Sequence, residues 1–189
     1  PGVTDADVRA RAELLVAGLE AVFDKHIASD PFNRLILTAG LTWQEADLVR
    51  GLMGYGRQIV LRQTYARIQE ILLKNAALVK AIVGWFVVKF DPDLSGDRAA
   101  AAQARSEEVA ELLKAVQTAD EDQVMRTLQN LVDSMLRTNF YRTDRKCHYI
   151  SFKFDHGKIR VLPAPRMWRE IYVHHREVEG VHLRGGPIA

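Results

Sequence analysis

The fold class of this chain is decided at residues 124–154, which read VMRTLQNLVDSMLRTNFYRTDRKCHYISFKF. Up to Leu136 the apolar residues recur every three or four positions, the spacing of one face of an α-helix. From Cys147 to Phe154 apolar and polar residues alternate instead, which is the spacing of a β-strand. We therefore predict an α+β protein, with a mainly helical domain at residues 1–138 and a small, mostly antiparallel β unit at residues 139–189.

Upstream of this stretch, one predicted helix follows another. Thr4 has the position of an N-cap, and the apolar spacing then continues to Phe23 as one helix. Asp30-Pro31 ends that helix, because proline cannot continue it. Further helices are predicted at about residues 35–37, 42–53, 59–73, 75–89 and 124–136, and in the Ala-rich stretch that ends near residue 116.

Two of these helices begin with a capping box. In this motif a Thr side chain accepts from the backbone N–H three residues later, and the Glu at that later position reaches back to the Thr N–H. The sequence places one box at Thr42 and Glu45 and a second at Thr118 and Glu121. The segment from residue 91 to residue 96, DPDLSG, is the clearest loop.

The β unit is expected to begin with a hairpin. Asp155-His156-Gly157 has the composition of a tight turn, and Ile159 and Val161 continue the alternation beyond it. Two more strands are predicted at residues 169–175 and 181–183. A helical layer with so few strands does not make a balanced fold, so we expect the sheet to continue past Ala189 in a longer polypeptide.

The composition is that of a globular protein in a reducing compartment. The 189 residues are 48% hydrophobic and 26% charged, and Cys147 is the single cysteine, so no internal disulfide forms. The most apolar stretch, residues 76–90, contains Lys80 and is too short to span a bilayer. We expect a cytoplasmic protein without a membrane partner.

The positive charge is concentrated in the last quarter of the chain. Residues 1–140 contain 16 basic and 19 acidic residues, whereas residues 141–189 contain 10 basic and 5 acidic ones. A basic tail with aromatic residues raises the possibility of a nucleic-acid binder, which salt-dependent binding to oligonucleotides would test. The bases alternate with apolar residues along predicted strands, so we expect solvent-facing strand positions and no nucleic-acid partner.

Glycines and histidines form no recognisable site in the sequence. Gly51, Gly54 and Gly56 follow helical sequence with the wrong spacing for a dinucleotide loop, which favours a loosely packed or kinked helix. His174 and His175 are adjacent, so in a strand they point to opposite faces and do not share a metal. No metal site, catalytic residue or nucleotide site is predicted in this chain.

The triplet Arg184-Gly185-Gly186 is the one feature with the composition of a binding site. Consecutive glycines allow a backbone to approach a ligand closely, and an arginine can hold a carboxylate through two hydrogen bonds. His182 lies two residues before the glycines. We predict that Arg184, Gly185 and Gly186 lie next to a substrate site, although a Gly-Gly pair is equally common in ordinary turns.

From about Asn33 to its end, the chain resembles the large class of bacterial NAD-specific glutamate dehydrogenases. The resemblance rests on LRTNFY at 136–141, YISFKFD at 149–155, PR at 165–166, EGVHLRGGP at 179–187, and, in the helical part, FNRL at 32–35 and AGLTWQE at 39–45. It implies a very long enzyme of amino-acid catabolism that converts L-glutamate to 2-oxoglutarate and ammonium and transfers a hydride to NAD.

The resemblance also implies what this chain lacks. In the family, the Arg-Gly-Gly that grips the substrate lies beyond the segment that matches residues 183–189, and the catalytic lysine and the nucleotide-binding domain come later. We therefore expect an inactive scaffold whose partners are the rest of the same polypeptide and further copies in a homo-oligomer. The alternative is a self-contained helical interaction domain with no enzymatic role, which a sheet with no exposed edge would favour.

Overall fold

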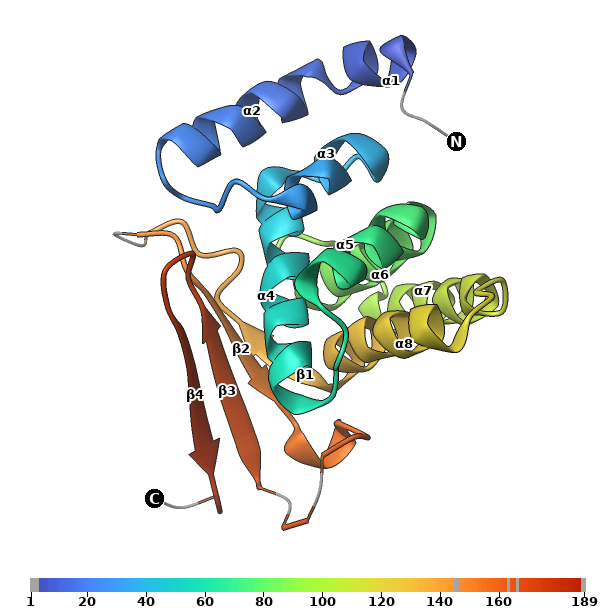
Figure 1. The fold of residues 1–189 in the computed structure, drawn as a ribbon. Coiled ribbons are helices and arrows are strands. Elements are labelled where there is room, and N and C mark those ends of the chain that lie inside the picture. Colours follow the sequence, from blue (N-terminus) through green and yellow to red (C-terminus); the bar gives the residue numbers. More distant parts are fainter. Residues whose placement is uncertain (1–3, 145–146, 163, 166, 188–189) are drawn as a thin grey trace.

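The computed structural model describes residues 4–144, 147–162, 164, 165 and 167–187. This part of the chain contains eight α-helices and one antiparallel four-stranded sheet, which confirms the α+β prediction. In Figure 1 the sheet lies on one side of α4 and helices α5–α8 lie on the other side. α4 is therefore the element that joins the two layers.

The helices begin with a pair at the surface. α1 (Asp5–Ala10) and α2 (Ala12–Phe23) lie across α3 (Figure 1), and Thr4 caps α1 in a full capping box with Asp7. The prediction of one continuous helix up to Phe23 was wrong, because the backbone leaves the helical conformation at Arg11. The Arg11 guanidinium donates to the carbonyl of Leu37, so the break attaches this pair to α3.

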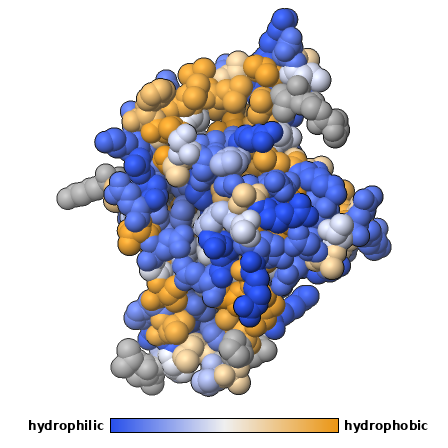
Figure 2. Space-filling view, viewed as in Figure 1, coloured by the Kyte–Doolittle hydropathy of each residue, from blue (hydrophilic) through white to orange (hydrophobic). Residues whose placement is uncertain are grey.

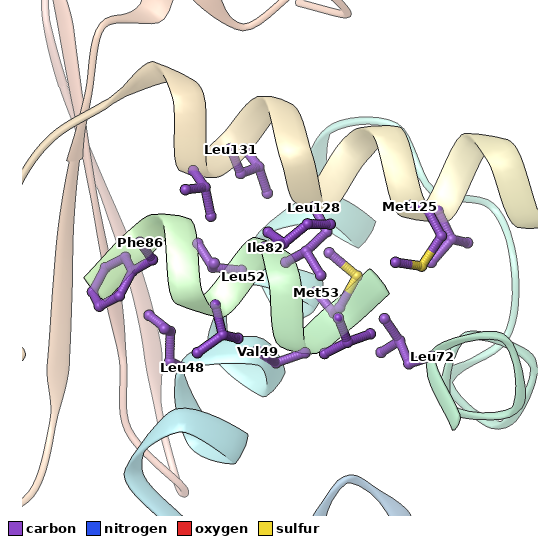
Figure 3. Close-up of a cluster of buried hydrophobic side chains, with 14 of the residues drawn as sticks. Leu48, Val49, Leu52, Met53, Leu72, Ile82, Phe86, Met125, Leu128 and Leu131 are labelled. Carbon is purple, nitrogen blue, oxygen red and sulfur yellow. The ribbon is translucent and has the colours of Figure 1, made fainter. Parts of the chain in front are cut away.

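The helical core surrounds α4 (Trp43–Ile59), which begins at the predicted Thr42 capping box. Before it come the 3-10 helix η1 (Pro31–Asn33) and α3 (Arg34–Thr38); after it come α5 (Tyr65–Lys74), α6 (Ala76–Phe90), α7 (Arg98–Leu113) and α8 (Ala119–Ser134). Figure 3 shows side chains from α4, α5, α6 and α8 packed into one cluster, Met53 and Leu128 among them. Burial of this apolar surface is the main stabilising contribution.

Half of the second predicted capping box is present. Thr118 accepts from the backbone N–H of Glu121, as predicted, and caps α8. The Glu121 carboxylate instead accepts from Lys74 at 2.6 Å, which links α8 to the end of α5. Among the described residues no single helix is long and apolar enough to cross a membrane; α5 and α6 pass that test only as a pair bent by 90°.

The sheet has the strand order β1-β2-β3-β4, with every neighbouring pair antiparallel. Its strands are β1 (Met135–Thr138), β2 (Ile150–Phe154), β3 (Arg169–His174) and β4 (Glu179–Arg184). The prediction that Met135 and Leu136 continue the helix was wrong. Helical spacing does continue through them, but α8 ends at Ser134 because the next residues pair with β2.

The predicted hairpin at Asp155-His156-Gly157 is also wrong. These residues enter the 3-10 helix η2 (His156–Lys158), and Ile159 beyond it is fully buried in the core. Both edges of β2 are already occupied, by β1 on one side and β3 on the other, so no edge remains for residues 159–161. β4 lies at an edge of the sheet, with the apolar side chains of Val181 and Leu183 exposed.

The glycines of α4 allow the sheet to pack closely on the helix. A Cβ on Gly51 would lie 2.9 Å from the His174 ring, and one on Gly54 would lie 2.9 Å from the Tyr172 hydroxyl. Both glycines are buried in the interior of a continuous helix and closely contacted, so the expectation of loose packing was wrong. The absence of side chains at these positions brings β3 into contact with the α4 backbone.

Candidate functional site

A buried carboxylate, Asp47, lies where α4 meets the sheet. Asp47 is only 2% exposed, and two imidazole rings approach its two carboxylate oxygens. His148 Nε2 lies 2.8 Å from Oδ2, and His174 Nε2 lies 3.2 Å from Oδ1. His148 comes from the segment before β2 and His174 from the end of β3, so one helical carboxylate holds two separate parts of the β unit.

The same carboxylate forms an ion pair with Arg50, one turn further along α4. Arg50 continues outward to Asp30, with Nε 2.8 Å from Oδ2 and Nη2 3.0 Å from Oδ1. Its Nη2 also donates to Asn33 Oδ1 at 2.7 Å. This two-bond contact with Asp30 uses the planar geometry of the guanidinium and fixes the loop before η1 against α4.

We call Asp30, Asp47, Arg50, His148 and His174 the Asp47 network. Its charged groups stabilise one another against the cost of burial. Burial alone would raise the pKa of Asp47, but hydrogen bonds from His148 and His174, with the charges of His174 and Arg50, hold that pKa well below its ordinary value. For His174, burial would lower the pKa, whereas the hydrogen bond to Asp47 and the nearby carboxylate of Glu179 raise it to about 8. The structure therefore favours a carboxylate and an imidazolium in direct contact.

The geometry of these groups suits a structural role better than acid–base catalysis. An Asp–His pair serves catalysis when the second imidazole nitrogen faces a substrate. Here His174 Nδ1 is buried and points toward a second carboxylate, with Glu179 Oε1 3.9 Å away. No group of three His, Cys, Asp or Glu side chains in the described part of the chain has the geometry of a metal site.

A pocket of about 560 Å³, lined largely by charged and polar residues, opens beside the network. Asp30, Arg50 and Gln69 line it from the helices, and His175 and Glu179 line it from the β3–β4 hairpin. Glu179 accepts from Gln58 of α4 at 2.9 Å, so the hairpin is bonded to the helix beyond Asp47 as well. The pocket thus lies between the helices and the β3–β4 hairpin, and His174 lines it as well.

A second buried acid–base pair lies at the other end of β3. His156 and Glu170 are both buried, with His156 Nε2 3.6 Å from Glu170 Oε2. The other ring nitrogen, Nδ1, accepts from the backbone N–H of Met167 at 3.1 Å. This pair fixes η2 against β3 and has no open face toward a ligand.

The predicted triplet Arg184-Gly185-Gly186 lies at the end of β4, away from the Asp47 network. The Arg184 guanidinium lies over the Trp168 ring, 5.6 Å from its centroid. Gly185 and Gly186 follow the strand in a bend, and a Cβ on Gly185 would meet nothing within 4 Å. A role beside a substrate site stays a prediction for these three residues. His182 is exposed on the same strand.

Comparison with known proteins gives two matches that divide the chain. A family model described as "Glutamate dehydrogenase, helical motif 3" matches residues 27–92, and one described as "Bacterial NAD-glutamate dehydrogenase, catalytic domain" matches residues 108–189. NAD-specific glutamate dehydrogenases are similar over nearly the whole chain. The one from Mycobacterium tuberculosis is 35% identical over 191 residues, and the one from Pseudomonas aeruginosa is 34% identical over 191 residues.

The chain belongs to the bacterial NAD-specific glutamate dehydrogenase family. Each of these two alignments covers 98% of the chain but 12% of the relative, so the chain spans about an eighth of its relatives' length. The relative from Halomonas elongata is 34% identical over 164 residues, which is 85% of the chain and 10% of the relative.

Within this glutamate dehydrogenase framework, the Asp47 network joins the two matched segments. Asp30, Asp47 and Arg50 lie in helical motif 3, whereas His148 and His174 lie in the segment that matches the catalytic domain. That segment begins at residue 108 and so includes α8 as well as the sheet. The predicted division at residue 138 stays a prediction.

Sequence reasoning missed this network, although part of its signal is visible. Asp47 is the one charged residue in the stretch 46–49 of the predicted helix, and Arg50 follows three residues after it. A charged pair within an apolar run marks a buried ion pair, because an unpaired charge there would be costly. Nothing in the local sequence shows that His148 and His174, about a hundred residues further on, complete it.

Proposed function

We propose that this chain is a structural segment of an NAD-dependent glutamate dehydrogenase. The enzyme as a whole would convert L-glutamate and NAD to 2-oxoglutarate, ammonium and NADH, as a cytoplasmic homo-oligomer of amino-acid catabolism. The proposal assigns NAD binding and the catalytic groups to other parts of that enzyme. Family membership supports the reaction, because the similar proteins are NAD-specific glutamate dehydrogenases.

The observation that carries the structural role is the buried contact of Asp47 with His148 and His174. It connects helical motif 3 to the first strands of the catalytic segment through charged hydrogen bonds, which are stronger and more directional than neutral ones. A rigid connection of this kind would hold the sheet of the catalytic segment in a fixed orientation relative to the helices. Asp47 itself is buried, and both of its oxygens are taken up by His148, His174 and Arg50.

Two measurements on the purified 189-residue chain test the absence of catalysis. We expect no NADH to form from L-glutamate and NAD, and no heat of binding when NAD is titrated into the chain. Turnover of glutamate by this chain, or tight binding of NAD, would contradict the proposal.

Hydrogen exchange in the full chain tests the connecting role. We expect the amides of β2 and β3 to be protected nearly as strongly as those of α4, because the two layers open together. In Asp47→Asn the strands should lose more protection than α6 does. Equal loss of protection in both layers would mean that Asp47 supports general stability and does not specifically connect them.

A further inference from the structure

Helix α2 is far more apolar than its burial explains. It is as apolar in average composition as α6, which is a core helix, yet its only buried residues are Gly18 and Ala21. Leu19 is 59% exposed and Phe23 is 81% exposed. A monomeric protein rarely leaves large apolar side chains clustered on one helix unless the surface contacts something.

The exposed residues form one stripe. Ala12, Val16, Leu19 and Phe23 follow each other at intervals of four, three and four, so they lie along one face of α2. Gly18 faces the opposite way, toward Ile36 of α3. Figure 2 shows hydrophobic surface across the top of the molecule, where Figure 1 places α2. We call Ala12, Val16, Leu19 and Phe23 the α2 stripe.

An acidic border runs along one side of the α2 stripe. Glu13, Glu20 and Asp24 are spaced by seven and four residues, so they share one side of the helix, and all three are exposed. None of the three forms an ion pair with any residue that the structure describes. The carboxylates are therefore available to a partner that carries positive charge.

The charge around the stripe is negative overall. Residues 5–24 contain five acidic residues and two basic ones, Arg9 and Arg11. Arg11 is turned inward, where it donates to the carbonyl of Leu37. A hollow of about 440 Å³ lies at the end of the stripe and is large enough for an apolar side chain. It is lined by Val22, Phe23, Ile27 and Ala28, and the basic residues Lys25 and Arg176 border it, so the negative charge is confined to the side of α2 that carries Glu13, Glu20 and Asp24.

We propose that the α2 stripe is a docking surface for an amphipathic α-helix whose own apolar stripe is bordered by lysine or arginine. A helix is the occupant that fits a narrow convex ridge with intervals of three and four, because such ridges pack into the grooves of another helix. Basic residues beside its stripe would meet Glu13, Glu20 and Asp24. This inference does not depend on the proposed enzymatic role of the parent protein.

A second copy of this chain fits the surface less well. In an antiparallel two-fold pair of α2 helices, the border of one helix faces the same border of the other. The acidic border formed by Glu13, Glu20 and Asp24 would then lie along the acidic border of the other copy, and like charges repel. The charge pattern therefore favours a different helix over self-association.

Two synthetic peptides test the proposal on the full 189-residue chain. Both peptides carry leucines at intervals of three and four; one has lysine on the borders of that stripe and the other has glutamate at the same positions. We expect the lysine peptide to bind in a fluorescence anisotropy titration, with affinity that falls as salt rises, and the glutamate peptide not to bind. The chain has a net charge of +2, so general attraction does not favour the lysine peptide.

Matched variants locate the binding. The double change Leu19→Ser and Phe23→Ser should weaken binding of the lysine peptide by about tenfold or more, because it removes most of the apolar contact. Val161→Ser is the control: Val161 is also exposed, but it lies after η2 and outside the stripe. Circular dichroism should show unchanged folds, since all three side chains are on the surface.

Four outcomes would overturn the proposal. They are binding of neither peptide, equal binding of both, equal weakening by the Val161→Ser control, and formation of a dimer of the free chain that the double variant abolishes. The last outcome would assign the α2 stripe to a second copy of the chain.

Discussion

Gly51 of α4 lies directly against the imidazole of His174 on β3. A Cβ at position 51 would be 2.9 Å from His174 Cγ and 3.0 Å from both Cβ and Cδ2, distances that real side chains do not tolerate without movement. His174 is itself held by Asp47, so it has little freedom to move away. This glycine thus determines how close the sheet can approach the helix.

We predict that Gly51→Ala destabilises the protein even though alanine favours helix. Overpacking in a tight contact costs about 1–3 kcal/mol, and because Asp47 holds His174 in place we expect the upper part of this range, which exceeds the gain of about 1 kcal/mol in helix propensity. Gly84→Ala is the matched control, because its Cβ would approach only the flexible end of Arg105, at 4.0 Å. In denaturant unfolding, the free energy of unfolding should fall for Gly51→Ala and rise for Gly84→Ala. Changes of the same sign in both variants would contradict the packing argument.

Asp47→Asn should lower the free energy of unfolding by about 3 kcal/mol. The substitution removes the charge that faces Arg50, His148 and His174, and breaking a buried ion pair leaves the partners uncompensated in a poorly solvated site. Asp122→Asn serves as the comparison, since Asp122 pairs with Arg126 on an exposed helix surface and should leave stability nearly unchanged. If both variants lose the same free energy of unfolding in urea titrations, the buried ion pair contributes no more to stability than the exposed one.

The stability of the protein should fall as the pH rises from 6.5 to 8. The pKa of His174 is raised from its ordinary 6.5 to about 8, so its contribution is complete below 6.5 and is lost as the pH passes through 8. We expect a loss of about 1 kcal/mol across this window, measured as urea midpoints. His174→Asn should abolish most of this pH dependence; an unchanged slope in that variant would assign it to another group.

Two other groups limit the pH window in which His174 can be observed. The lowered pKa of Asp47 means that its contribution is present above the ordinary value of 3.8 and is lost only as the pH falls well below it. Burial lowers the pKa of Lys89 to about 8, so the folded state loses that proton before the unfolded chain does, and stability rises with pH above 8. Between these two limits, the change of stability with pH therefore reports the protonation of His174.

Lys89→Met removes two hydrogen bonds from the end of α8, and we expect their loss to outweigh the relief of burying the Lys89 charge, with a net destabilisation of about 1 kcal/mol. The Lys89 ammonium donates to the carbonyls of Val132 at 2.7 Å and Asp133 at 2.8 Å, which the last turn of a helix leaves without partners. Methionine keeps the apolar stem but cannot donate. Lys80→Met is the control, because Lys80 is exposed on the same helix. A thermal midpoint that is the same for both variants would show that the carbonyls do not need this donor.

Local sequence signals predicted where helices begin better than they predicted where helices end. Thr42 and Glu45 form their capping box as expected, because every atom involved lies within four residues. The end of α8 was missed, because helical spacing continues to Leu136 while the chain has already left the helix to pair with β2. Where a distant strand competes with a local preference, the local pattern alone is not decisive.

The sequence by itself determined the α+β class, the capped helix starts and the strand spacing of residues 150–154, since these depend on neighbours a few positions apart. Only the tertiary structure decided that β2 lies between β1 and β3 and that the sheet packs closely against α4 at its glycines. It also decided that His148 and His174 both contact Asp47. The physical reason is that a carboxylate can remain charged in the interior only where its partners converge, and that convergence is a property of the folded chain.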